Sequence, residues 1–219
     1  MTLFLIPTPI GNLKDITLRT VETINQLDEI ICEDTRRTLK LLNYLKLKKP
    51  VESFFEHNEE KKIPKILKKL KEGKNIGLIS DAGTPLICDP GFKLVREAIK
   101  DNIKIVALPG ASSLLTGLLQ SGFPPYPFAF FGYPPEKKKK REEFFKTLKE
   151  QKMTKIIFSS PHKIKFHLKE MLEIIGDIDI YIGRELTKLY EENYYGKLSN
   201  AIKHFENKNV KGELLIVFQ

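Results

Sequence analysis

The chain has 219 residues, enough to bury the core of one large α/β domain or of two small ones. Hydrophobic residues make up 41% of it, a share that excludes a disordered chain. The formal net charge of +9 suggests a polyanionic partner, although a thermophile-like surface rich in lysine and glutamate explains such a charge equally well.

The sequence lacks the signatures of several protein classes. The apolar run at the amino terminus stops at Pro7, so we expect no signal peptide, no membrane span and a cytoplasmic protein. Cys32 and Cys88 belong to no cluster of metal ligands, so we expect no metal and interpret both as small buried residues. Phosphate-loop, dinucleotide-binding, zinc-hydrolase and nucleophile-elbow motifs are all missing, which argues against those chemistries.

Short β-rich runs, each followed by a turn and a helical pattern, recur along the first half of the chain. This rhythm is typical of βα units and of a mostly parallel sheet. The pattern predicts strands at 3–7, 27–32, 75–80 and 104–108, and helices at 35–45, 63–70, 91–100 and 112–119.

A stretch rich in proline and aromatic residues follows Gly122, as in many linkers between domains. We therefore predict two α/β domains, residues 1–121 and 122–219. The second half repeats the alternation, with strands at 128–132, 155–159, 178–183 and 213–218, and helices at 139–151, 163–175 and 199–206.

Two turns at strand ends are candidates for a ligand site. The segment SDAGTP (80–85) follows the third predicted strand, and LPGASS (108–113) follows the fourth. Ligands of open α/β sheets bind beyond the carboxyl ends of the strands, where Gly83 permits a close backbone approach. A purely structural role for both turns is equally compatible with the pattern.

Six ordered motifs resemble those of a known family. They are TPIGNL (8–13), EDTR (33–36), SDAGTPLICDPG (80–91), LPGASS (108–113), Pro161-His162 and RELTKLYEE (184–192). Together they resemble the tetrapyrrole methylase superfamily, and within it the branch that methylates a cytidine 2′-oxygen of bacterial small-subunit (16S) ribosomal RNA. The resemblance implies two α/β domains of the class III methyltransferase type, with S-adenosyl-L-methionine in the cleft between them. It also implies a homodimer that acts on 16S rRNA or on the small ribosomal subunit.

Matching the motifs implies cofactor contacts in both predicted domains. They fall on Pro9, Asp81, Gly83, Thr84, Ile87, Ser112 and Ser113 in the first, and on Phe131, Ser160 and Glu213 in the second. The segments at 131–141 and 158–163 depart from the usual family pattern, and many relatives carry a carboxyl-terminal extension that this sequence lacks.

Methyl transfer to a ribose depends first on holding the oxygen in line with the methyl carbon, at about 3 to 3.5 Å. A carboxylate or a neutral amine can then take the hydroxyl proton. The catalytic candidates are Asp34, Glu185 and Lys188, together with Glu33 and Asp89. Helix capping by Asp34 and a salt bridge between Glu185 and Lys188 are the structural alternatives.

Basic residues supply the candidates for RNA binding. The run from Lys137 to Arg141 can follow phosphates, while Tyr126, Phe130 or Tyr133 can stack on an unpaired base. Arg36, Arg37 and Arg184 are suited to bidentate phosphate contacts, and His162 either contacts substrate or begins a helix. Two other functions remain open, a tetrapyrrole methyltransferase and a non-catalytic RNA-binding assembly factor.

Overall fold

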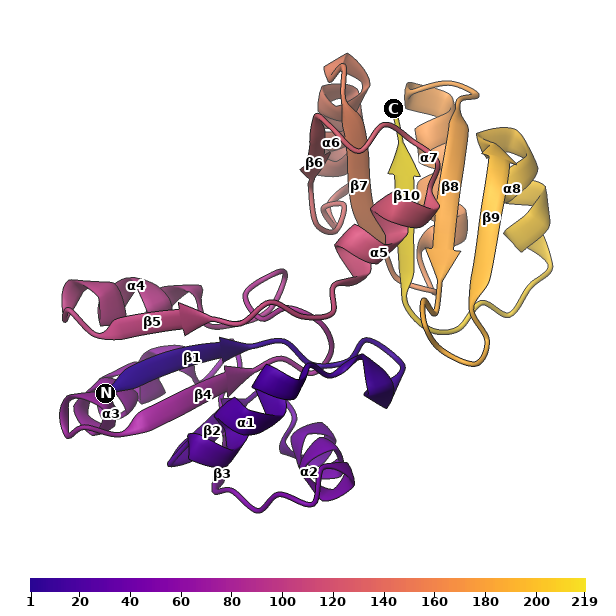
Figure 1. Cartoon of the computed structure of the whole chain (residues 1–219). Helices are drawn as coiled ribbons and strands as arrows, with labels where there is room; N and C mark the ends of the chain where they lie inside the picture. Colours follow the sequence, from indigo (N-terminus) through magenta and orange to yellow (C-terminus); the bar gives the residue numbers. More distant parts are fainter. The chain divides into compact units, whose positions relative to one another are not determined.

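The computed structural model describes residues 1–219 and divides into two compact units, Met1–Ser112 and Ser113–Gln219. Each unit has its own five-stranded sheet with helices packed against it (Figure 1). The α/β class expected from the sequence is therefore confirmed.

All strand pairs of the first unit are parallel, as the sequence predicts. The strand order is β3-β2-β4-β1-β5, so the first strand lies inside the sheet. The short edge strand β3 was not predicted, since three residues carry no recognisable alternation. The strands are β1 (Thr2–Ile6), β2 (Glu29–Cys32), β3 (Val51–Ser53), β4 (Asn75–Ile79) and β5 (Lys104–Ala107).

Helices cover both faces of this sheet. Ile24 of α1 (Leu18–Gln26) and Leu42 of α2 (Thr35–Tyr44) pack on one face. Ile66 of α3 (Glu59–Lys71) and Leu94 of α4 (Phe92–Lys100) pack on the other. The chain therefore leaves the adjacent strands β1 and β4 toward opposite faces, which defines a topological switch point of the kind where ligands bind.

The sheet of the second unit is mixed, which corrects the expectation of a mostly parallel one. Only β6 and β7 are parallel, and every other pair is antiparallel. The reason is local, because a short loop at 185–191 joins β8 to β9 as a hairpin in place of a crossover helix. In the order β6-β7-β10-β8-β9, the strands are β6 (Phe128–Phe130), β7 (Thr154–Ser159), β10 (Leu214–Phe218), β8 (Asp179–Arg184) and β9 (Glu192–Lys197).

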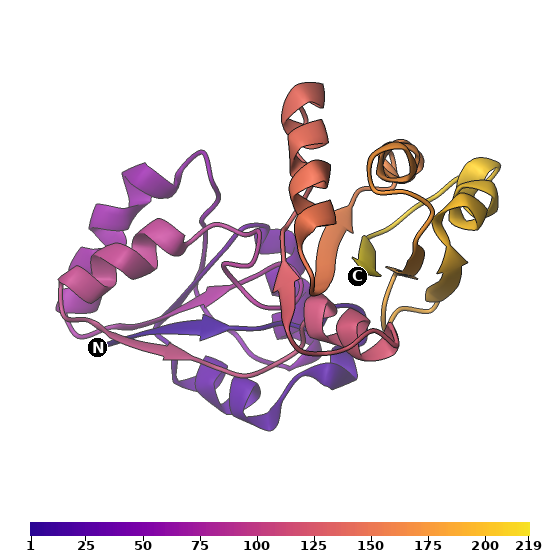
Figure 2. The ribbon, with the colours of Figure 1, turned by 90° about the horizontal axis from the view of Figure 1, so that it is seen from above.

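Three helices cover one face of the second sheet and α5 covers the other (Figure 2). The three are α6 (Lys138–Glu150), α7 (Ile164–Ile174) and α8 (Leu198–Glu206). The sequence assigned α5 (Ser113–Gln120) to the first domain, whereas Leu118 packs against β10 of the second. Burial of this apolar helix face therefore puts the boundary at Ser112, before the proline-rich stretch.

The two cysteines differ in burial. Cys32 lies in the core of the first unit, whereas Cys88 is exposed in the loop after β4, which corrects the expectation that both are buried. No group of three His, Cys, Asp or Glu side chains is arranged to hold a metal ion. None of the helices is long and apolar enough to span a membrane.

Candidate functional site

Four of the six motifs meet at one edge of the first unit. They follow β1, β2, β4 and β5, whose carboxyl ends lie together because the strands are parallel and adjacent. Segments separated by up to a hundred residues of sequence thus form one surface, the carboxyl edge.

A pair of backbone hydrogen bonds joins the first and third of these loops. The N–H of Thr8 donates to the Gly83 carbonyl, and the N–H of Gly83 donates to the Thr8 carbonyl, both at 2.9 Å. The buried Thr8 hydroxyl also donates to the Ser80 carbonyl at 3.0 Å, and the Ser80 hydroxyl donates to the Gly83 carbonyl at 2.6 Å. The two loops are therefore fixed to each other directly beyond their strands.

Glycine is required where these loops approach one another. Gly83 has a φ of +80°, and a Cβ there would lie 3.1 Å from Ile10 Cγ2. A Cβ at Gly110 would lie 2.7 Å from Pro7 Cβ. The Thr84 hydroxyl donates to the Ala111 carbonyl at 3.2 Å, so the loop after β5 joins the same assembly.

The segment 33–36 is held to this assembly by Asp81. Its carboxylate accepts the N–H of Asp34 at 2.9 Å and lies 3.5 Å from Arg37 Nε. Asp34 in turn caps α2 at the Arg36 N–H and binds the Arg36 guanidinium. These hydrogen bonds from Arg36 lower the pKa of Asp34 to about 2, so Asp34 is a poor proton acceptor.

Ile87 projects from a strained part of the loop after β4. Leu86 and Cys88 on either side of it have φ values of 73° and 64°, in the left-handed region that such residues seldom adopt. The Ile87 side chain is 44% exposed as a result. Strain of this kind clusters at ligand-binding sites, and it presents an apolar side chain at the carboxyl edge.

In the second unit, the RELTK segment forms an ion cluster with the start of β10. Lys188 Nζ donates to Glu185 Oε1 at 2.7 Å and to Glu213 Oε2 at 3.2 Å. The N–H of Glu213 also donates to Glu185 Oε1 at 3.0 Å. A Cβ at Gly212 would lie 2.2 Å from the Glu185 carboxyl carbon, so only glycine leaves room for that carboxylate.

The electrostatics of this cluster argue against a general base in it. Burial alone would raise the pKa of Glu185, but hydrogen bonds from Lys188 and from the Glu213 N–H outweigh burial and lower it. Burial likewise opposes the charge on Lys188, but its bond to Glu185 prevails and raises its pKa. Both groups therefore stay charged, which favours a positioning role over proton transfer.

Ser160 lies at the carboxyl end of β7, where its carbonyl accepts the N–H groups of Lys163 and Ile164 and so begins α7. Beside it, the buried Ser159 hydroxyl lies 2.9 Å from Nδ1 of the buried His167. Phe131 is half-buried and packs edge-on against Phe144.

Arg141 is not available to RNA, which corrects the sequence-based expectation. Its buried guanidinium pairs with Glu170, donates to the carbonyls of Pro135 and Glu136, and lies 4.5 Å above the Phe166 ring. Four of its five N–H donors are thus used within the unit.

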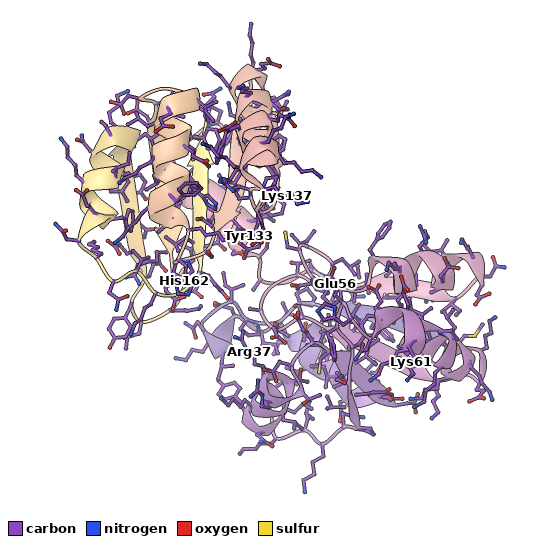
Figure 3. The ribbon with its side chains drawn as sticks, turned by 180° about the vertical axis from the view of Figure 1, so that it is seen from behind. Arg37, Glu56, Lys61, Tyr133, Lys137 and His162 are labelled. Atoms are coloured by element: carbon purple, nitrogen blue, oxygen red, sulfur yellow. The ribbon has the colours of Figure 1, made fainter.

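The other basic candidates differ in accessibility. Arg36 and Arg37 have side chains 86% and 56% exposed, whereas Arg184 binds Glu192 and the Lys211 carbonyl and is largely buried. Lys137 and His162 are exposed in the turns before α6 and α7. Figure 3 shows both, with Tyr133, at the end of the second unit from which these helices start.

Glu33 and Asp89, the remaining catalytic candidates, line a small pocket with Ser80 at the carboxyl edge. Sequence reasoning did not single out Thr8, Ser80, Gly110 or Gly212, although each stands within three residues of a strand end. Small polar residues and glycines at strand ends are the signal that could have found them.

The family profile and the named relatives identify the chain as a methyltransferase. The chain belongs to the tetrapyrrole (corrin/porphyrin) methylase family, whose sequence profile matches residues 2–202. A solved cobalt precorrin-4 methyltransferase shares the fold at 17% identity, with a TM-score of 0.74 over 99% of this chain and 94% of that one. A solved diphthine synthase shares the fold at 15% identity, with a TM-score of 0.76 over 100% of this chain and 90% of that one.

The more similar relatives carry the name ribosomal RNA small subunit methyltransferase I. The Thermotoga maritima protein is 46% identical over 98% of this chain and 96% of its own length. The Bacillus subtilis protein is 42% identical over 99% of this chain and 74% of its own length. These relatives confirm the branch of the superfamily that the six motifs indicate.

His167 should make the stability of the second unit depend on pH. Burial, and then the charge of Arg141, lower its pKa from 6.5 to about 4. The unfolded chain therefore becomes protonated at this histidine below about pH 6.5, whereas the folded chain becomes protonated only below about pH 4. As the pH is lowered from about 6.5 to 4, we expect the unfolding free energy, measured by denaturant titration, to fall by roughly 3 kcal/mol from this group.

The variant His167→Gln should show a smaller loss over the same window, while the exposed-site control His57→Gln should match the wild type. Equal pH dependence in all three proteins would show that His167 is not responsible.

Proposed function

We propose that the protein transfers the methyl group of S-adenosyl-L-methionine to the 2′-oxygen of a cytidine in small-subunit (16S) ribosomal RNA. The observation that carries this proposal is 46% identity over 98% of the chain to a relative of that name. We further propose that it acts in the cytoplasm as a homodimer, with naked 16S rRNA or the small subunit as its partner.

The carboxyl edge of the first unit fits the donor chemically. Three joined loops there offer backbone polar groups at strand ends, the half-exposed hydroxyl of Thr84 and the exposed apolar side chain of Ile87. When bound, the donor supplies an electrophilic methyl group on a positively charged sulfur. The proposed contacts are Pro9, Asp81, Gly83, Thr84, Ile87, Ser112 and Ser113, with Phe131, Ser160 and Glu213 from the second unit.

Within this proposal, Asp81 acts partly through its neighbours. Both of its carboxylate oxygens already face residues 34–37, one accepting the Asp34 N–H and the other near Arg37. Asp81 therefore fixes that segment beside the donor site. Glu185 and Lys188 similarly fix the loop before β10, where Glu213 stands.

For the acceptor, the proposal relies on a block of exposed lysines, in which Lys138 alone forms an ion pair, 3.7 Å from Glu142. Lys137, Lys138, Lys139 and Lys140 are exposed at the start of α6, with no acidic residue in the first turn. Such a block attracts phosphates by releasing counterions, and the exposed Tyr133 nearby can stack on an unpaired base. Arg36, Arg37 and His162 are the further proposed RNA contacts, with Arg184 orienting Glu192.

The activity is tested by incubating the purified protein with labelled donor and unmodified small ribosomal subunits, and in parallel with tetrapyrrole precursors. We expect label only in RNA, recovered after nuclease digestion as 2′-O-methylcytidine. Label confined to the tetrapyrrole would contradict the proposal, and absence of both transfer and donor binding would favour an assembly factor.

The variant Gly83→Val should lose donor binding, which we expect to be micromolar in the wild type. A branched side chain would collide with Ile10 and occupy the space beside the joined loops. Calorimetry should show at least about a hundredfold weaker binding, which corresponds to about 2.7 kcal/mol.

Gly73→Val is the matched control, because Gly73 also has a positive φ (+96°) but nothing within 4 Å of a Cβ. It introduces the same backbone strain away from the carboxyl edge. Equal losses in the two variants would mean that strain, and not the site, explains the effect.

A further inference from the structure

We propose that Glu33 is the residue that accepts the proton of the ribose hydroxyl during methyl transfer. This inference rests on the proposed function and names a residue that neither the family profile nor the relatives' names assign. It distinguishes Glu33 from four other candidates in the matched motifs.

Glu33 occupies the appropriate place in the sheet. In the pairing of β2 with β4, Cys32 lies opposite Ile79, so Glu33 follows beside Ser80 at the carboxyl edge. Adjacent strands are about 4.8 Å apart, which keeps Glu33 next to the loop that carries Asp81 and Gly83. It also lines a small pocket with Ser80, Pro85 and Asp89.

The Glu33 side chain is free to act, because it makes no hydrogen bond or ion pair within the chain and is exposed at the edge. The three candidates favoured from sequence are each engaged. Asp34 binds Arg36, and Glu185 and Lys188 bind one another. Asp89 also has an interaction of its own.

The surroundings of Glu33 increase its proton affinity. Partial burial raises its pKa most, and the negative charge of Asp81 raises it further. Arg37 opposes this shift, while Asp34 and Glu56 add to it. A carboxylate with a raised pKa is the better general base, in contrast to Asp34 with its strongly lowered pKa.

The step balances with groups already named. Glu33 takes the hydroxyl proton as the ribose oxygen bonds to the methyl carbon, and the electron pair of the broken carbon–sulfur bond stays on sulfur. The positive charge of the sulfonium and the negative charge of the carboxylate disappear together. Exposure of Glu33 then lets the proton leave to solvent.

The test is Glu33→Gln in single-turnover methylation of small subunits, together with calorimetry of donor binding. Removing a general base should slow methyl transfer by about 10²- to 10⁴-fold. Donor affinity should stay within about threefold of wild type, because the variant changes charge but not shape. The wild-type rate should rise with pH as Glu33 ionises, and the rate of the variant should not show this rise.

Glu56→Gln is the matched control, because Glu56 is an exposed carboxylate near Glu33 and is outside the proposed machinery. The Glu56→Gln variant should keep the wild-type rate at neutral pH. The rise of its rate with pH should begin at lower pH, because the charge of Glu56 raises the pKa of Glu33. Glu33→Asp should be faster than Glu33→Gln but slower than wild type, since it keeps a carboxylate on a side chain one methylene shorter.

Three results would overturn the inference. A Glu33→Gln rate within threefold of wild type, with an unchanged pH profile, would show that Glu33 is not the proton acceptor, while leaving the proposed function intact. Loss of donor binding in that variant would assign Glu33 a structural role instead. A wild-type protein that binds donor but methylates no RNA would refute the proposed function, and the inference with it.

Discussion

The two hydrogen bonds between the Thr8 and Gly83 backbones are the constraint on which the rest of the site depends. They join the loops after β1 and β4 at the point where the chain leaves adjacent strands toward opposite faces of the sheet. Backbone pairing this close requires glycine at position 83 and satisfies groups that burial would otherwise leave unpaired. The carboxyl edge can therefore be preorganised before any ligand arrives.

Charge is distributed around this rigid edge in two ways. Several ionised groups there are committed to partners, such as Asp81 to the Asp34 N–H and to Arg37, and these hold loops in place. Glu33 carries a carboxylate without such a partner. Catalysis by positioning needs fixed groups, whereas proton transfer needs a group whose charge can change, and the two demands fall on different residues.

Much of this arrangement could be predicted from the sequence, because its determinants are local. A β-rich run ending in SDAGTP is enough to place a glycine turn at a strand end, and parallel strands bring such turns together. The hairpin of β8 and β9 was missed because its loop at 185–191 contains no glycine to mark a tight turn. The burial of Arg141 could not be predicted, because it depends on a distant partner. Arg141 in a basic run is indistinguishable from a solvated residue until Glu170, 29 residues away, is placed beside it. The same holds for α5, whose apolar face has no assigned sheet until β10 is placed.

Hydrogen–deuterium exchange with and without S-adenosyl-L-methionine tests most directly whether the joined loops form the donor site. The account predicts slower exchange on ligand addition in segments 7–13, 80–91 and 108–113, with the amides of Thr8 and Gly83 among the most protected. Unchanged exchange in those segments, or protection confined to the opposite edge of the sheet, would contradict it.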